Sequence, residues 1–160
     1  GEMLSAGLPL GVVAAREDVL DLEPGMYDPV MGGCWLSIAA ALETLQVIKD
    51  EGLVERSERI GRSVQKRLRD LFEDLELGWD VRGVGMLIGF EVVSGGDPDP
   101  GLAREIVAEC LRVGLMLRRG GSTIMITPAL NIEEEVLEKG MEILEEKVSE
   151  LSRLSRASSS

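Results

Sequence analysis

The sequence of 160 residues contains no histidine, two cysteines, two tryptophans, two phenylalanines and one tyrosine. Without imidazole the chain has no Ser-His-Asp or Cys-His nucleophile, no histidine-ligated zinc or haem, and no histidine general base working near neutral pH. Acid–base chemistry would have to come from carboxylates, lysine, tyrosine or a bound cofactor. These absences exclude many enzyme classes but leave open the enzymes that depend on a cofactor.

Basic residues are also scarce, because 17 lysines and arginines stand against 29 acidic residues, for a formal net charge of −12. Nucleic acids and anionic membranes are bound through clustered lysine and arginine, which neutralise phosphate. The few aromatic residues leave little surface on which bases could stack. Glycines or charges interrupt every apolar stretch before the about 18 residues of a membrane span. We therefore expect neither a nucleic acid nor a membrane as partner.

The two cysteines, Cys34 and Cys110, are far apart and form no CxxC pair. The first residues show no basic segment followed by an apolar one, as a signal peptide would have. Both observations favour a reduced, cytoplasmic protein.

The apolar pattern divides the chain into two parts and a tail. In residues 1–52, Leu8–Ala15 is predicted to be a buried strand. A loop rich in glycine and proline follows, and then a helix from Trp35 so apolar that Ile38–Leu45 would be exposed without a larger domain. Residues 53–152 are predicted to form a mixed α+β domain, and the serine-rich residues 153–160 a disordered tail. The elements expected in residues 53–152 are helices at 53–75, 102–113 and 133–151, a strand or hairpin within 80–93, a loop at 94–101, and strands at 115–117 and 123–126.

Four segments carry a family resemblance, in matching order and spacing along nearly the whole chain. They are GEMLSAGLPLGVVAAR (1–16), GGCWLSIAAALETLQVIKDEG (32–52), DVRGVGMLIGFE (80–91) and IMITPALNIEEE (124–135). Together they resemble the C-terminal portion of the class III (subgroup II) pyridoxal-phosphate-dependent aminotransferases. This group contains acetylornithine, ornithine and 4-aminobutyrate aminotransferases and glutamate-1-semialdehyde aminomutase.

The resemblance implies a fold-type-I enzyme, whose architecture runs from α/β to α+β. Residues 1–52 would be the last strand, loop and helix of the large domain that binds pyridoxal phosphate. Residues 53–152 would be the connecting helix and the small C-terminal domain. The family forms homodimers and moves an amino group from an amine or amino acid to a 2-oxo acid, and we expect the same partners here.

Three positions depart from the family pattern. Glu2 occupies the position of the lysine that forms a Schiff base with the cofactor, and a carboxylate cannot form an imine. Val30 occupies the position of a threonine that binds the cofactor phosphate, so the hydroxyl is lost. Met125 occupies the position of an arginine that binds the substrate carboxylate. The resemblance therefore implies a chain that lacks the Schiff-base lysine and is inactive alone.

The sequence is compatible with several alternatives. Core packing would also explain Val30 and Met125, and Glu2 would be explained by a sequence boundary at that point. Arg118 and Arg119 either receive an anion at the site or lie in a solvated turn. The chain as a whole could instead be a non-catalytic dimerisation or regulatory protein, paired with an aminotransferase-like chain. A third possibility is a ligand-binding module that uses the open face of its sheet.

Overall fold

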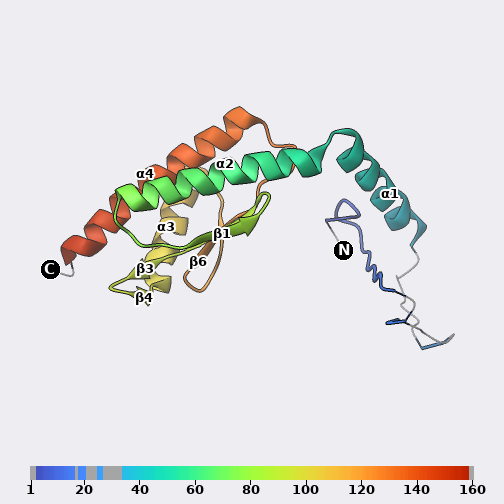
Figure 1. Ribbon diagram of the computed structural model, residues 1–160, viewed down its shortest axis with the longest axis horizontal. Helices are drawn as coiled ribbons and strands as arrows, with labels where there is room; N and C mark the ends of the chain where they lie inside the picture. Colours follow the sequence, from blue (N-terminus) through green and yellow to red (C-terminus); the bar gives the residue numbers. More distant parts are fainter. Residues whose placement is uncertain (1–2, 17, 21–24, 27–33, 159–160) are drawn as a thin grey trace. The chain divides into compact units, whose positions relative to one another are not determined.

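The computed structural model describes residues 3–16, 18–20, 25–26 and 34–158 (Figure 1). The chain forms two compact units, Gly1–Leu53 and Val54–Ser160. In chain order the elements are α1 (Trp35–Asp50), α2 (Leu53–Asp74), β1 (Val81–Val84), β2 (Leu87–Glu91), β3 (Val93–Ser94), β4 (Asp97–Pro98), α3 (Pro100–Arg112), β5 (Arg118–Gly120), β6 (Thr123–Ile126) and α4 (Glu134–Ser158).

The first unit contains the helix α1, which begins at Trp35 as the sequence predicts. Gly52 follows its last turn with a φ of 59°, and its N–H donates to the Lys49 carbonyl at 3.3 Å. Glycine adopts this left-handed conformation without steric cost, so it ends the helix. Most of the large apolar side chains of α1 are exposed, among them Trp35 at 87% and Leu42 at 64%.

The strand predicted at Leu8–Ala15 does not form in this structure. Val12 and Val13 are 64% and 80% exposed. The described residues of the first unit contain no other strand with which this segment could pair. A single extended segment cannot satisfy its backbone N–H and C=O groups by itself, and this explains why the apolar run alone is not enough.

The second unit is built on a four-stranded antiparallel sheet with the strand order β1-β2-β6-β5. Of the strand or hairpin predicted within 80–93, the structure shows the hairpin, formed by β1 and β2. The predicted loop at 94–101 instead contains a small hairpin of β3 and β4. The strand predicted at 115–117 lies slightly later, at Arg118–Gly120, where Thr123–Ile126 provides a partner.

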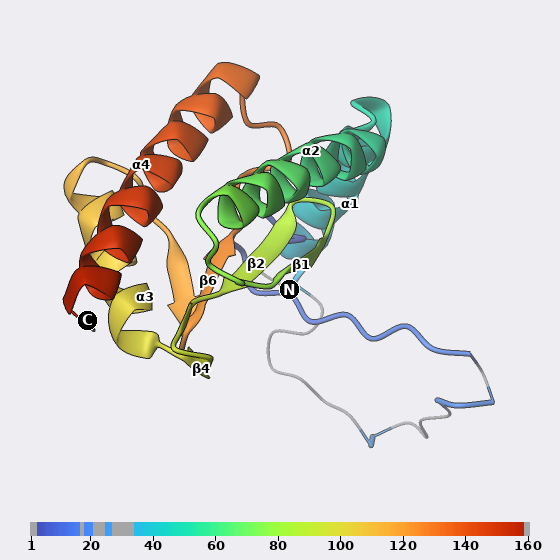
Figure 2. The same ribbon diagram turned by 60° about the vertical axis from the view of Figure 1, so that its left-hand side comes forward.

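Three helices, α2, α3 and α4, cover one face of this sheet (Figures 1 and 2). Burial alternates along β2 and β6, so that Ile88, Phe90, Ile124 and Ile126 are buried against the helices. Apolar residues of all three helices join these four in one continuous core. Within the second unit, the described helices thus form one layer and the sheet the other, as in an α+β domain.

An aromatic cluster fixes the end of α2 against the sheet. The rings of Phe72, Trp79 and Phe90 lie with centroids 5.1–6.0 Å apart. The Trp79 indole Nε1 donates to the Val93 carbonyl at 2.9 Å, so its polar atom is satisfied although the ring is buried. Such contacts add to the area that the rings bury.

At its other end α2 passes very close to the turn between β1 and β2. Gly61 on the helix faces Gly85, where an added Cβ would lie 1.9 Å from the Gly85 carbonyl oxygen. The Met86 N–H donates to the Ser57 Oγ at 3.0 Å. The absence of a side chain at Gly61 therefore allows the helix and the turn to make contact.

The last helix, α4, contacts both α2 and α3. The Arg67 guanidinium of α2 pairs with Glu138 at 2.6 Å and with Glu145. The helix continues to Ser158, beyond the end at Leu151 that the sequence predicts, and so includes most of the expected tail. No glycine or proline follows Gly140, and Leu151 and Ser152 are buried, so the last turns lack a helix-breaking residue.

Among the described residues, no helix combines the length and apolar character needed to cross a membrane.

Candidate functional site

A row of four residues runs across the face of the sheet opposite to the helices. The strand register aligns Arg82 with Gly89, Gly89 with Met125, and Met125 with Arg118. Residues directly opposite in an antiparallel pair point to the same face, with Cβ atoms roughly 4.5–5.5 Å apart. Arg82 is exposed and pairs with Asp80 at 2.8 Å. The sheet therefore brings Met125 and Arg118 together, although the sequence separates them.

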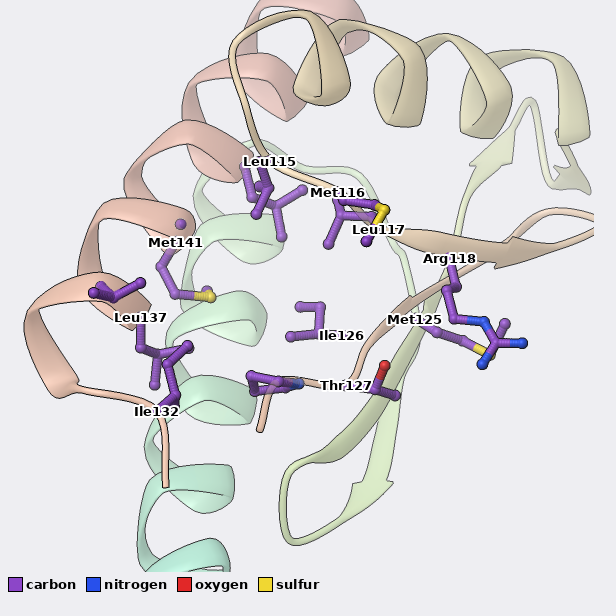
Figure 3. A pocket seen from close by; sticks show the side chains of 14 residues that line it. Leu115, Met116, Leu117, Arg118, Met125, Ile126, Thr127, Ile132, Leu137 and Met141 are labelled. Carbon is purple, nitrogen blue, oxygen red and sulfur yellow. The ribbon is translucent and has the colours of Figure 1, made fainter. Parts of the chain in front are cut away.

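A cavity of about 520 Å³ lies beside this row, within the second unit. Its walls are the first half of α4, residues 115–117, the end of β6 and the segment that follows it (Figure 3). Of its 14 lining residues, only Arg118 and Thr127 have polar side chains. Both its size and its mostly apolar lining are those of small-molecule sites.

The polar side chains gather at one end of this cavity. Figure 3 shows Arg118, Met125 and Thr127 together at that end, with Leu137 and Met141 of α4 at the other. Within the described part of the chain, the Arg118 guanidinium and the Thr127 hydroxyl have no ion-pair or hydrogen-bond partner. Among those residues, no other group competes with a ligand for these two.

A second cavity, of about 300 Å³, lies between α2 and α4. It is lined by Arg59, Arg67, Glu134 and Glu138, among others. These charges already pair with one another, since Arg59 lies 3.0 Å from Glu134 and Arg67 lies 2.6 Å from Glu138. Its polar groups stabilise the helix pair and are not free for a ligand.

The three predicted site residues fall in different parts of the structure. Glu2 and Val30 lie outside the described residues, so their roles stay predictions. Met125 lies on β6, is partly buried, and lines the larger cavity. The structure adds that Arg118 lies directly opposite Met125, at the edge of the sheet.

Sequence reasoning did not identify Thr127 as part of a site. Thr127 follows Thr123 and Met125 at two-residue intervals, and such residues share one face of a strand. This alternation was a usable signal. The sequence offers no comparable signal for the part of the cavity formed by α4. Leu137, Met141 and Leu144 lie on one apolar face of the helix, and core packing alone would also explain such a face.

A covalent link to pyridoxal phosphate needs a lysine amine, so the positions of the lysines show whether the described residues can form such a site. The four lysines of the sequence lie on helices: Lys49 on α1, Lys66 on α2, and Lys139 and Lys147 on α4. None of them lines either cavity described above.

Two of these amines are also held in the protonated form. A hydrogen bond to Asp70 raises the pKa of Lys66, and hydrogen bonds to Glu150 and Glu146 raise the pKa of Lys147. Imine formation needs a neutral amine. Because none of the four lysines lines either cavity, the described residues do not fit a covalent cofactor site.

The two thiols differ in their surroundings, and both are free. The backbone N–H groups at the start of α1, that of Ser37 above all, lower the pKa of the Cys34 thiol. Burial raises the pKa of the Cys110 thiol to about 11. Among the described residues, no group of three or more Cys, Asp or Glu could hold a metal ion.

A protein-family model described as "Aminotransferase class-III" matches residues 1–148. The alanine/serine racemase of Pyrococcus horikoshii is 33% identical over 152 residues, an alignment that covers 92% of this chain and 32% of that protein. The acetylornithine aminotransferase of Archaeoglobus fulgidus is 37% identical over 143 residues, which cover 88% of this chain and 34% of that protein. The chain thus spans about a third of the length of the curated relatives it matches.

Solved structures give the same result for the fold. The ornithine aminotransferase of Toxoplasma gondii is 26% identical, with a TM-score of 0.73 over 84% of this chain and 31% of that chain. The acetylornithine aminotransferase of Elizabethkingia anophelis is 29% identical, with a TM-score of 0.70 over 81% of this chain and 33% of that chain.

Proposed function

Because this chain belongs to the class III aminotransferase family, we propose that it forms the C-terminal part of an aminotransferase-type subunit. Its fold is that of the fold-type-I enzymes, and the family depends on pyridoxal phosphate. In this proposal residues 1–52 end the large domain and residues 53–152 form the small domain. The observation that carries the proposal is the match over residues 1–148, which corresponds to about a third of each relative.

The reaction of the whole subunit would be the transfer of an amino group between an amino acid or amine and a 2-oxo acid. Relatives named acetylornithine and 4-aminobutyrate aminotransferases support this choice. Other relatives are named alanine/serine and leucine/methionine racemases. Amino acids are common to both groups of names, so an amino acid is the substrate class that the family supports best.

This chain alone would not hold the cofactor covalently. By resemblance Glu2 replaces the Schiff-base lysine, and the four lysines lie on helices away from both cavities. Loss of the hydroxyl at Val30 would also weaken binding of the cofactor phosphate. Loss of the guanidinium at Met125 would weaken binding of the substrate carboxylate, because neither side chain can bind an anion. We therefore expect an inactive chain.

The test is to incubate the 160-residue chain with pyridoxal phosphate, reduce with borohydride, and map modified lysines by mass spectrometry. The chain in denaturant is the matched control, because its lysines react without a site. We expect the native chain to show no lysine modified more completely than in this control. Nearly complete modification of one lysine in the native chain, abolished by Lys→Arg at that position, would overturn the proposal.

We also propose that the chain pairs with itself or with an aminotransferase-like chain. The support is the apolar surface of α1, where Trp35, Leu36 and Leu42 are 87%, 66% and 64% exposed. Exposed apolar surface of this kind is typical of protein interfaces. A cytoplasmic location stays a prediction, supported by the two free thiols.

A further inference from the structure

The larger cavity of the second unit has two chemically different ends. Leu137 and Met141 of α4, with Ile132 beside them, form the apolar end (Figure 3). Arg118 and Thr127 lie at the other end (Figure 3). A ligand that fits this cavity must therefore be apolar along most of its length and polar at one end.

The charge of the polar end is positive. Arginine stays protonated at every pH of interest, and its planar fork matches the two oxygens of a carboxylate. No acidic residue is among those that line the cavity. The Thr127 hydroxyl can donate a further hydrogen bond to an anion.

Arg118 differs in this respect from the neighbouring arginine. Arg119 is the next residue on β5, so its side chain starts on the opposite face of the sheet. Its guanidinium donates to the Gly121 carbonyl at 3.0 Å. Arg118 makes no such bond with the described residues, and it lines the cavity. The chain thus offers one guanidinium for an anion and a matched one that is already bonded.

We propose that this cavity binds an amphipathic monocarboxylate, with its carboxylate on Arg118 and Thr127 and its aliphatic chain against α4. The binding arginine would come from β5, directly across the sheet from Met125. The proposal concerns binding alone and needs no cofactor. It can therefore fail while the proposed function stands, and the reverse also holds.

The test is calorimetric titration of the 160-residue chain with butyrate, hexanoate and octanoate, without pyridoxal phosphate. Each added methylene should tighten binding roughly fourfold, since each removes a similar apolar area from water. Hexanol and hexylamine, which have the same chain length, should bind at least tenfold more weakly than hexanoate, because only the carboxylate pairs with a guanidinium.

Two arginine variants locate the anion. Arg118→Gln should weaken hexanoate binding about tenfold or more, because a hydrogen bond between charged groups is lost. Arg119→Gln removes the same charge one residue away and should leave the affinity within about twofold. Equal loss in both variants, or no loss in either, would overturn the assignment to Arg118.

A third variant fills the apolar end of the cavity with a side chain. Gly140 of α4 lines the cavity, and a Cβ added there would lie 3.5 Å from the Leu115 Cδ1, an ordinary contact. Gly140→Leu should keep the circular dichroism spectrum and lose octanoate binding. Octanoate binding that is unchanged in this variant, or carboxylates that bind no better than hexanol, would overturn the proposal.

Discussion

The contact between α2 and the β1–β2 turn leads to a prediction whose sign opposes the usual rule. Replacing glycine by alanine inside a helix normally stabilises a protein by about 0.5–1 kcal/mol. At Gly61 the new Cβ would lie 1.9 Å from the Gly85 carbonyl oxygen and 2.3 Å from its carbon. These are backbone atoms, so no side-chain rotation can relieve the clash.

Overpacking of this kind costs about 1–3 kcal/mol, and the short distances place Gly61→Ala at the upper end. After the gain in helix propensity, the expected net loss in the free energy of unfolding is about 2 kcal/mol. In a unit of this size the melting temperature should then fall by roughly 10 °C.

The assay is thermal and urea unfolding followed by circular dichroism, with Gly140→Ala as the matched control. Gly140 is also helical, and its added Cβ would make only an ordinary contact at 3.5 Å. The free energy of unfolding of this control should rise by about 0.5–1 kcal/mol. If Gly61→Ala is as stable as the parent, the close approach of α2 to Gly85 is not present in solution.

Three further predictions concern Asp99, the two cysteines and Leu42. Asp99 accepts a hydrogen bond from the Leu102 N–H at 2.9 Å, which lowers its pKa. Asp99→Ala should therefore cost about 1 kcal/mol at pH 7. This difference in stability between the parent and the variant should disappear as the pH falls through the lowered pKa of Asp99. Urea unfolding of both proteins across that pH range measures it, and a difference that does not change with pH would contradict the prediction. Iodoacetamide at pH 7.5 should label Cys34 and leave Cys110 unlabelled until urea unfolds the chain, because only the thiolate reacts. Peptide mass spectrometry checks this order, and early labelling of Cys110 would refute its burial. Leu42→Glu should reduce self-association in light scattering, because Leu42 is 64% exposed on α1. The control Glu43→Gln, on the same turn, should not, and equal masses for the parent and Leu42→Glu would exclude α1 as the interface.

Helices and strands whose apolar pattern depends only on residues nearby in the sequence could be predicted. The helix from Trp35 and the amphipathic helix from Leu53 form as expected, because their patterns depend only on neighbours one turn away. LIGFE and TIMI likewise lie where strands were predicted, and their burial alternates along each strand. Leu8–Ala15 has a similar apolar composition, but the described residues of its unit contain no strand with which it could pair. Composition alone does not reveal whether a partner exists.

The candidate site was predictable only in pieces. Met125 and Arg118 were each singled out from the sequence, for separate reasons, but their pairing depends on the register between β5 and β6. Register is set by the turn and by which face is buried, and a shift of one residue would have placed Arg118 on the other face. The predicted strand at 115–117 was too early, so it could not have given this pairing.

The two tryptophans lie in different units and in opposite surroundings. Trp79 is 5% exposed and packs against Phe72 and Phe90, whereas Trp35 is 87% exposed on α1. Each unit therefore carries its own intrinsic fluorophore, one emitting from an apolar environment and the other from water. With Trp35→Phe in place, the emission of Trp79 would report the unfolding of the second unit alone, because only this ring passes from an apolar environment into water.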